Sequence, residues 1–177
     1  MIYIYKDIFL RAIEENDLEL LKEMINDPLI EIMTGGYSYP VSSLQQRIWY
    51  ENVLVDNDDL RLIIETKNDG AVGIVMLTNI DWKNRTAEFH SKIKTTGNLR
   101  GKGLGTMATT AIVKYGFDHL NLKLIYSTII EYNNASQRVK EKCGFVKDGV
   151  LRNRIFKNGE YHNVTIWSIQ TGELIES

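Results

Sequence analysis

The sequence predicts an α/β fold, built as an α+β mixed sheet. Its 177 residues are about the length of one domain and suffice for a single hydrophobic core. Segments with strand chemistry alternate with amphipathic segments, in the order strand, helix, helix, hairpin, strand, helix, strand, helix, hairpin. Strands joined through a helix can pair in parallel, whereas hairpins are antiparallel. We therefore expect one domain over 1–177, with a mostly antiparallel sheet of about seven strands and about four helices.

The N-terminal segment is expected to form one short strand and then a helix. Residues 9–13 have the strand pattern, and Asn16 or Asp17 can cap the helix that follows. Four apolar side chains then recur at helical spacing: Leu18, Leu21, Met24 and Ile25. Pro28 lies just beyond the expected end of this helix.

A second helix is expected to begin after Ser42. Ser42 and Gln45 have the spacing of a capping box, in which each side chain satisfies a backbone amide of the other residue. The apolar residues that follow extend this helix toward Asp56. The preceding segment 34–40 is rich in turn formers and aromatic residues, which indicates a loop.

The remaining chain is expected to hold most of the strands. The strands are expected over 60–66, 72–80, 86–93 and 122–130, and in a final hairpin that turns at Asn158-Gly159 and ends near Ile169. The helices are expected over 103–118 and 135–142.

The formal net charge of −2 conceals a division along the chain. Residues 1–70 hold 14 acidic and 6 basic side chains, whereas residues 71–177 hold 9 acidic and 15 basic ones. A basic second half suits a phosphorylated ligand. The acidic first half argues against a nucleic-acid partner, because duplex binding depends on many cationic contacts with phosphates. Solvated surface charge that is merely uneven would give the same counts.

The expected location is cytosolic. Cys143 is the only cysteine, which excludes an intramolecular disulfide and a cysteine-based zinc cluster, and no metal is expected. Charges near the N-terminus argue against a signal peptide, and no apolar run approaches the ~18 residues that span a bilayer. We interpret Cys143 as a small core residue, and Trp49, Trp82 and Trp167 as packing residues.

The strongest local signal is the run Arg100-Gly101-Lys102-Gly103-Leu104-Gly105-Thr106, between a strand and a helix. Glycines let the backbone approach a ligand closely, and the first amides of a helix attract phosphate. The spacing matches neither the P-loop nor the dinucleotide-binding G-x-G-x-x-G. The run is a candidate phosphate-binding loop, and a flexible loop that merely starts a helix is the alternative.

Two blocks of sequence resemble the GNAT acetyltransferase superfamily. Arg100-x-x-Gly103-x-Gly105 matches its (Gln/Arg)-x-x-Gly-x-(Gly/Ala) pyrophosphate loop. Further along, Asn133-x-Ala135-Ser136-x-Arg138-Val139-x-Glu141-Lys142-x-Gly144-Phe145 is similar to the block N-x-x-S-x-R-(hydrophobic)-Y-x-K-x-G-F, with Lys140 at the tyrosine position. The final hairpin resembles that of the branch containing ribosomal-protein-alanine and spermidine N-acetyltransferases.

The resemblance implies a splayed sheet that holds acetyl-CoA as co-substrate where two central strands part. It implies that loop amides hold the pyrophosphate, that the strand ending at Ile93 and the Asn133 side chain contact the pantetheine arm, and that Arg100 and Lys102 attract the phosphates. The residues assigned to acetyl-CoA are Ile93, Arg100, Gly101, Lys102, Gly103, Leu104, Gly105, Thr106 and Asn133.

Acetyl transfer to an amine needs a neutral nucleophile, a polarised thioester carbonyl and a proton for the departing sulfur. Glu88 is the candidate base, because it lies on the strand expected to border the thioester. There a carboxylate can take a proton through water or hold a cationic amine. His90 and Lys92 share the face of Glu88, because strand side chains alternate. His90 titrates near neutrality, and a packed histidine is the alternative.

The proton for the sulfur has two candidate donors. Ser136 occupies the position that the resemblance makes catalytic in some relatives, and a role in capping the helix is the alternative. Lys140 replaces the tyrosine to which the superfamily usually assigns this step. On a short helix, however, we interpret Lys140 as a solvated surface side chain. Further candidates of the acceptor pocket are Glu31, Tyr37, Tyr39, His162 and Asn163, with loop surface as the alternative.

Together these observations predict an acetyl-CoA-dependent N-acetyltransferase. Transfer is expected to go directly to a primary amine, because no activated cysteine or serine nucleophile with a partner is found. The expected acceptor is a small cationic amine such as a polyamine, or a protein N-terminus, with an amino sugar or an antibiotic left open. The rival predictions are a non-catalytic acetyl-CoA-binding regulatory module and a phosphate-loop nucleotide binder. The oligomeric state, a homo-oligomer included, is not determined by the sequence.

Overall fold

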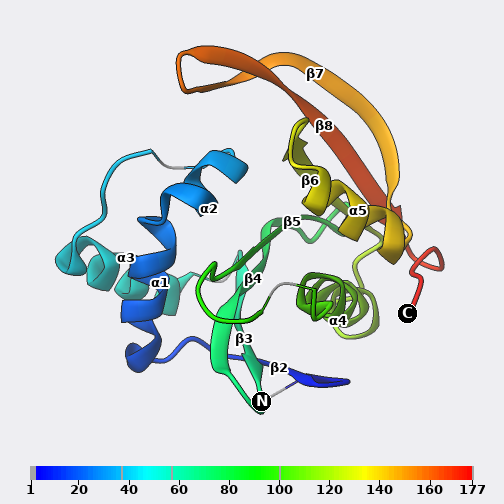
Figure 1. Cartoon of the computed structure of the whole chain (residues 1–177). Helices are drawn as coiled ribbons and strands as arrows, with labels where there is room; N and C mark the ends of the chain where they lie inside the picture. The colour runs from blue at the N-terminus through cyan, green and yellow to red at the C-terminus, as the bar shows by residue number, and fades with distance from the viewer. Residues whose placement is uncertain (1–2, 37, 57, 100, 177) are drawn as a thin grey trace.

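The computed structural model of the chain describes residues 3–36, 38–56, 58–99 and 101–176, and its elements are drawn in Figure 1. The strands are β1 (Tyr3–Tyr5), β2 (Ile8–Arg11), β3 (Leu60–Thr66), β4 (Gly70–Asp81), β5 (Thr86–Ile93), β6 (Leu124–Ile130), β7 (Val146–Lys157) and β8 (Glu160–Gln170). The helices are α1 (Leu18–Ile25), α2 (Pro28–Met33), α3 (Ser43–Val55), α4 (Leu104–Asp118) and α5 (Asn134–Cys143), with a short 3₁₀ turn at Glu15–Asp17.

All of these strands belong to one open sheet in the order β1-β2-β3-β4-β5-β6-β8-β7. Neighbouring strands are antiparallel except β5 and β6, which are parallel. The predicted mixed, mostly antiparallel sheet is confirmed. The described part of the chain holds eight strands rather than about seven and five α-helices rather than about four, because β1 and α2 add one of each.

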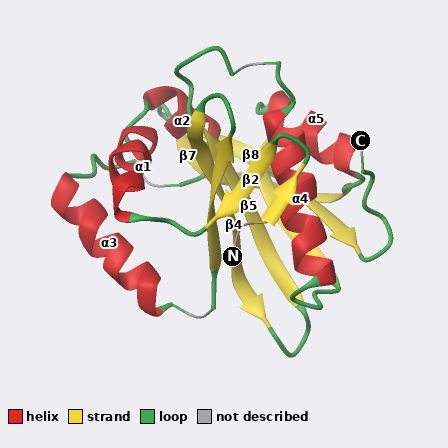
Figure 2. Cartoon of the chain, turned by 90° about the horizontal axis from the view of Figure 1, so that it is seen from below, coloured by secondary structure: helices red, strands yellow, loops and turns green. Residues whose placement is uncertain are grey.

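Helices cover the two faces of the sheet unequally. Figure 2 shows α4 and α5 on one side of the strands and α1 and α3 on the other. The larger core lies under α4, where strand residues such as Val75 and Ile125 pack against Ala111 and Ile112 of the helix. A smaller cluster around Ile63 and Leu21 lies between the sheet and the helices α1 and α3. This division leaves each face of β5 in a different environment.

The structure adds detail to two predictions about helix ends. Asp17 precedes α1 but makes no side-chain cap hydrogen bond to it. Both Asp17 oxygens instead accept from Arg11, at 2.7 and 2.9 Å, because the strand end brings that guanidinium beside the 3₁₀ turn. Pro28 lies just beyond the end of α1, as expected, and it also begins α2, which was not predicted. Proline fits there because the first helical residue needs no amide donor, and Asp27 caps this helix.

The single cysteine and the tryptophans show which packing predictions hold. Cys143 is fully buried, and Trp167 is buried with its indole N–H donating to Thr165 Oγ1 at 2.9 Å. Trp49 packs against the smaller core. Trp82 is 53% exposed in the turn after β4, so the packing prediction is wrong there: a tight turn leaves no neighbouring layer to cover a large side chain.

Candidate active site

The central feature of the site is the point at which β5 and β6 part. These strands pair only through Thr86 with Leu124, Ala87 with Ile125 and Glu88 with Tyr126. Beyond Glu88, the described residues offer β5 no strand partner on this side. Side-chain hydroxyls of β6 bridge the two strands instead: Ser127 Oγ donates to the Phe89 carbonyl at 3.1 Å and Thr128 Oγ1 donates to Glu88 Oε1 at 3.3 Å. An unpaired strand edge can pair with an extended ligand as it would with another strand.

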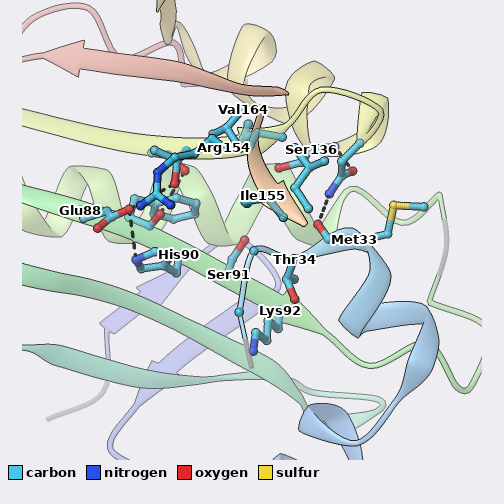
Figure 3. Close-up of a pocket in the computed structure, with 18 of the residues that line it drawn as sticks. Met33, Thr34, Glu88, His90, Ser91, Lys92, Ser136, Arg154, Ile155 and Val164 are labelled. Carbon is cyan, nitrogen blue, oxygen red and sulfur yellow. Dashed lines mark hydrogen bonds and ion pairs between the residues drawn. The ribbon is translucent and has the colours of Figure 1, made fainter. Parts of the chain in front are cut away.

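A cavity of about 540 Å³ opens at this point. Its walls include Glu88 to Lys92 of β5 and Ser127 to Ile130 of β6, and the loop after α2 and the strand β7 also contribute residues. Figure 3 shows side chains from these segments around the cavity. The parted strands therefore form a cleft with exposed backbone on one side and polar side chains on the other.

The glycine loop forms the N-terminus of α4, a helix that contacts both α5 and β5, although none of the described loop residues lines the cavity. Gly101 and Gly103 have φ angles of +78° and +73°, which other residues rarely adopt. Gly103 is the N-cap and provides no side-chain hydrogen bond, so no cap side chain satisfies the first amides of α4. A Cβ at either glycine would meet nothing within 4 Å, which leaves open space for an anion next to those amides.

The other residues assigned to acetyl-CoA take different positions. Arg100 lies outside the described residues. Lys102 is exposed, and its ammonium lies 3.3 Å from Asp69 Oδ2. Leu104 and Thr106 are buried at the start of α4, so only their backbone amides remain to contact a ligand. Gly105 packs against Val139 of α5, and Ile93 ends β5 paired with Gly73.

The helix α5 carries the second motif to the cleft. Asn133 caps this helix, because its Oδ1 accepts from the Ser136 amide at 3.1 Å, and its Nδ2 donates to the Met33 carbonyl at 2.9 Å. The Asn133 side chain therefore ties α5 to the end of α2. Ser136 lines the cavity and is not the capping residue. Its hydroxyl remains available to a ligand in the cleft.

Glu88 lies at the vertex of the parted strands and is held on several sides. Its oxygens accept from Thr128 Oγ1 and Asn79 Nδ2, each at 3.3 Å, and His90 Nε2 lies 3.7 Å away. Figure 3 shows Glu88 and His90 side by side at one end of the cavity. Burial lowers the pKa of His90 below 6.5, an effect that Glu88 opposes and Lys140 and Lys92 reinforce. The imidazole is therefore neutral at neutral pH and can accept a proton.

Lys140 corrects the most consequential prediction about the second motif. It is 1% exposed rather than solvated, because α5 turns this position toward the sheet. Its Nζ lies 3.2 Å from the ring centroid of Phe89 and 4.4 Å from that of Phe145. Among the described residues, this amine has no hydrogen-bond partner. Desolvation lowers its pKa well below the ordinary value of 10.5, which favours the neutral form of the amine.

The remaining acceptor-pocket candidates do not line the cavity. The Glu31 carboxylate contacts the Lys157 ammonium and accepts from Ser38 at 2.7 Å, and the hydrogen bond from Lys157 lowers the pKa of Glu31. Tyr39 is 71% exposed. His162 packs edge-on against the Tyr132 ring, and Asn163 donates to Glu131 at 3.0 Å. Tyr37 lies outside the described residues.

Sequence reasoning missed two cationic residues of the cavity, Lys92 and Arg154. Alternation along β5 places Lys92 on the same face as Glu88, which was the available signal. Arg154 comes from the last hairpin, whose position over the cleft depends on contacts far apart in the chain, such as that between Lys157 and Glu31. No local pattern marks it.

A sheet that parts between two parallel strands, beside a glycine-rich helix N-terminus, defines the class of CoA-dependent acyltransferases. Residues 7–146 match the family model described as "Acetyltransferase (GNAT) domain". The chain belongs to the GNAT acetyltransferase family, which confirms the resemblance of its two motifs. Among the described residues, no group of His, Cys, Asp and Glu is arranged to hold a metal ion, and no helix is long and apolar enough to cross a membrane.

Individual relatives match most of the length of the chain. The chain is 31% identical over 156 residues to the spermidine N(1)-acetyltransferase of Vibrio cholerae serotype O1, covering 88% of each chain. It is 30% identical to that of Escherichia coli strain K12, covering 87% of this chain and 81% of the relative. The crystal structure of the Vibrio cholerae enzyme in complex with CoA and spermine superposes with a TM-score of 0.88 at 29% identity, covering 94% and 97% of the two chains.

The burial of Lys140 predicts a stabilising substitution. Lys140→Met removes an amine without a partner and keeps the apolar stem, so the free energy of unfolding at neutral pH should rise by roughly 1–3 kcal/mol. The unfolded chain binds a proton that the folded chain does not, from the lowered pKa of Lys140 up to about 10.4. Wild-type stability therefore rises with pH across that window, and the variant loses this rise.

Denaturant unfolding of both proteins at several pH values checks this prediction. Lys142→Met is the matched control, because it makes the same change at an exposed site on the same helix. An unchanged pH slope in Lys140→Met would show that the two aromatic rings keep the ammonium charged.

The glycine loop predicts a selective loss of CoA binding. Gly103→Glu places a carboxylate beside the first amides of α4 and strains a residue at φ +73°, so the Kd for CoA should rise at least about tenfold. Calorimetric titration with CoA measures it. Gly172→Glu carries comparable backbone strain at φ +96° away from the cavity and should bind CoA as the wild type does; equal losses in both variants contradict the assignment.

Proposed function

We propose that residues 1–177 form one acetyl-CoA-dependent N-acetyltransferase domain that transfers the acetyl group directly to a primary amine. The parting of β5 and β6 directly after Glu88 carries this proposal, because it brings a carboxylate to the end of an unpaired strand edge. The glycine loop supplies phosphate-binding amides, and Asn133 and Ser136 lie along the same cleft. These residues fit a ligand with a polyphosphate end and an extended thioester arm.

In this proposal the residues of the cleft divide the chemistry between them. Backbone amides on the free edge of β5 polarise the thioester carbonyl. Glu88, assisted by neutral His90, orients the acceptor ammonium and takes its proton through water, which leaves the amine free to attack. Ser136 passes a proton to the departing sulfur. We do not assign this step to Lys140, because its side chain is buried, its Nζ lies against the Phe89 ring and it does not line the cavity.

The acceptor class is a small primary amine. Relatives named as spermidine acetyltransferases support a polyamine as the first acceptor to assay, and a protein N-terminus is the alternative. We also propose a cytoplasmic location, which the single buried cysteine supports because it forms no disulfide. A measurement of molecular mass in solution would show whether the enzyme is a homo-oligomer.

The base assignment predicts a loss of turnover with intact cofactor binding. Glu88→Gln keeps the hydrogen bonds of the side chain but cannot hold or deprotonate an ammonium, so kcat should fall by about 10²–10³-fold. CoA affinity should stay unchanged, because the partners of the Glu88 side chain are Thr128, Asn79 and His90, none of which is assigned to the cofactor. Steady-state kinetics measures kcat, and calorimetric titration measures the CoA affinity. Glu160→Gln, at an exposed turn, is the control; a loss below threefold, on the order of 0.6 kcal/mol, would remove Glu88 as the base.

The donor assignment predicts a smaller loss. Ser136→Ala should lower kcat by about 10–100-fold, because water can replace the hydroxyl in part. Solvent isotope effects should grow in the variant if proton delivery to sulfur becomes limiting. Unchanged kcat with unchanged isotope effect assigns Ser136 to binding alone.

The rival function is a non-catalytic acetyl-CoA-binding module. It is considered because Lys140 stands where the superfamily usually has a tyrosine. Both functions predict that acetyl-CoA raises the melting temperature, so a thermal-shift measurement does not distinguish them. Release of free thiol on addition of an amine mixture does. Release that persists in Lys140→Ala and is lost in Gly103→Glu supports the enzyme; absence of release with every amine supports the module.

A further inference from the structure

A second cavity adjoins the cleft on the acceptor side of β5. Its volume is about 630 Å³, and it lies between α1, α3 and the sheet. Its lining is mainly apolar and includes Met24, Trp49, Ile74 and Met76. Met76 and Lys92 line both cavities. An acceptor whose amine lies at Glu88 can therefore extend along Lys92 toward this apolar chamber.

Lys92 stands at the junction of the two cavities without a counter-charge. Among the described residues, no carboxylate lies within ion-pairing distance of it. Burial lowers its pKa, and the nearby charge of Lys157 adds to this effect. Figure 3 shows Lys92 beneath Thr34, away from Glu88 and His90. A half-buried cation in this position lacks the partner that proteins usually provide.

The carboxylates that might serve Lys92 are already engaged. Glu31 contacts Lys157, and Arg61, which lines the second cavity, binds both Asp56 and Asp59. Among the described lining residues of the two cavities, Glu88 is the single carboxylate, and it shares the cavities with the cations of Lys92 and Arg154, whereas the charge of Arg61 is compensated by its two aspartates. A linear polycation bound at Glu88 would carry its further ammonium groups toward these cations, which is unfavourable.

We propose that Lys92 selects acceptors that carry a carboxylate at the end opposite to the reacting amine. This inference rests on the proposed function and defines its acceptor class. Glu88 and Lys92 are four residues apart on one strand, so their Cα atoms are separated by about 13 Å. When both side chains point toward the acceptor, the Glu88 carboxylate and the Lys92 ammonium are closer together than the two Cα atoms. An acceptor whose amine and carboxylate are joined by several methylene groups then spans the distance between these two charged groups. The apolar lining at Met76 accommodates the methylenes.

Three six-carbon amines of matched length test the proposal: 6-aminohexanoate, hexylamine and 1,6-diaminohexane. Their far ends are anionic, apolar and cationic, respectively, and spermidine is the fourth acceptor. For the wild type, kcat/KM measured by thiol release at constant ionic strength should be highest for 6-aminohexanoate, at least about tenfold above the diamine, which corresponds to ~1.4 kcal/mol.

Charge variants at Lys92 make the test specific. Lys92→Gln should reduce the preference for 6-aminohexanoate over hexylamine at least about fivefold, and Lys92→Glu should reverse the order so that the diamine leads. Lys83→Gln, an exposed lysine that lines neither cavity, should behave as the wild type. The Kd for CoA, measured in parallel, should be the same in all variants, which shows that each one is folded.

Two outcomes overturn the proposal. One is a wild type that prefers spermidine or the diamine, and the other is a preference that survives in Lys92→Gln; in both, acetyl transfer still occurs and the proposed function stands. If no amine is acetylated, the proposed function fails instead. Calorimetric titration of the CoA complex with 6-aminohexanoate and 1,6-diaminohexane then gives the same ranking without turnover, and equal or reversed affinities overturn the inference.

Discussion

The functional architecture of this protein depends on the short pairing between β5 and β6. Parallel strands in a continuous sheet would satisfy each other's backbone groups along their whole length. Here the pairing ends at Glu88, and the edge of β5 is left with hydrogen-bonding groups that a ligand can use. This one interruption of the sheet opens the cleft. It also places Glu88 at the vertex of the cleft and leaves Ser136 on its wall.

Contacts between distant segments hold the cleft in this shape. Asn133 connects the start of α5 to the end of α2, and Lys157 of β7 contacts Glu31 of α2. The final hairpin and α2 are thereby joined over the cleft. On the opposite side, Lys140 is inserted between Phe89 and Phe145 at a cost in stability, since its amine gains no hydrogen bond there.

Local patterns were sufficient to predict most elements. The capping box at Ser42 forms as expected, β5 has the predicted bounds, and the Asn158-Gly159 turn joins the last two strands. Elements with weak local signals were missed: β1 is only three residues long, and α2 begins at a proline that equally marks a helix end. The charged partners of Asp17 and Glu31 were also beyond prediction, because Arg11 and Lys157 reach them through the tertiary fold.

The sequence by itself determined the family, the class of sheet and the glycine loop at the start of α4, because helix caps, turns and phosphate-binding loops are properties of neighbouring residues. Only the tertiary structure decided that Lys140 is buried, that Glu31 is paired with Lys157, and that Lys92 lines two cavities with no ion-pair partner among the described residues. Whether a charged side chain is available to a ligand depends on which distant groups the fold places beside it.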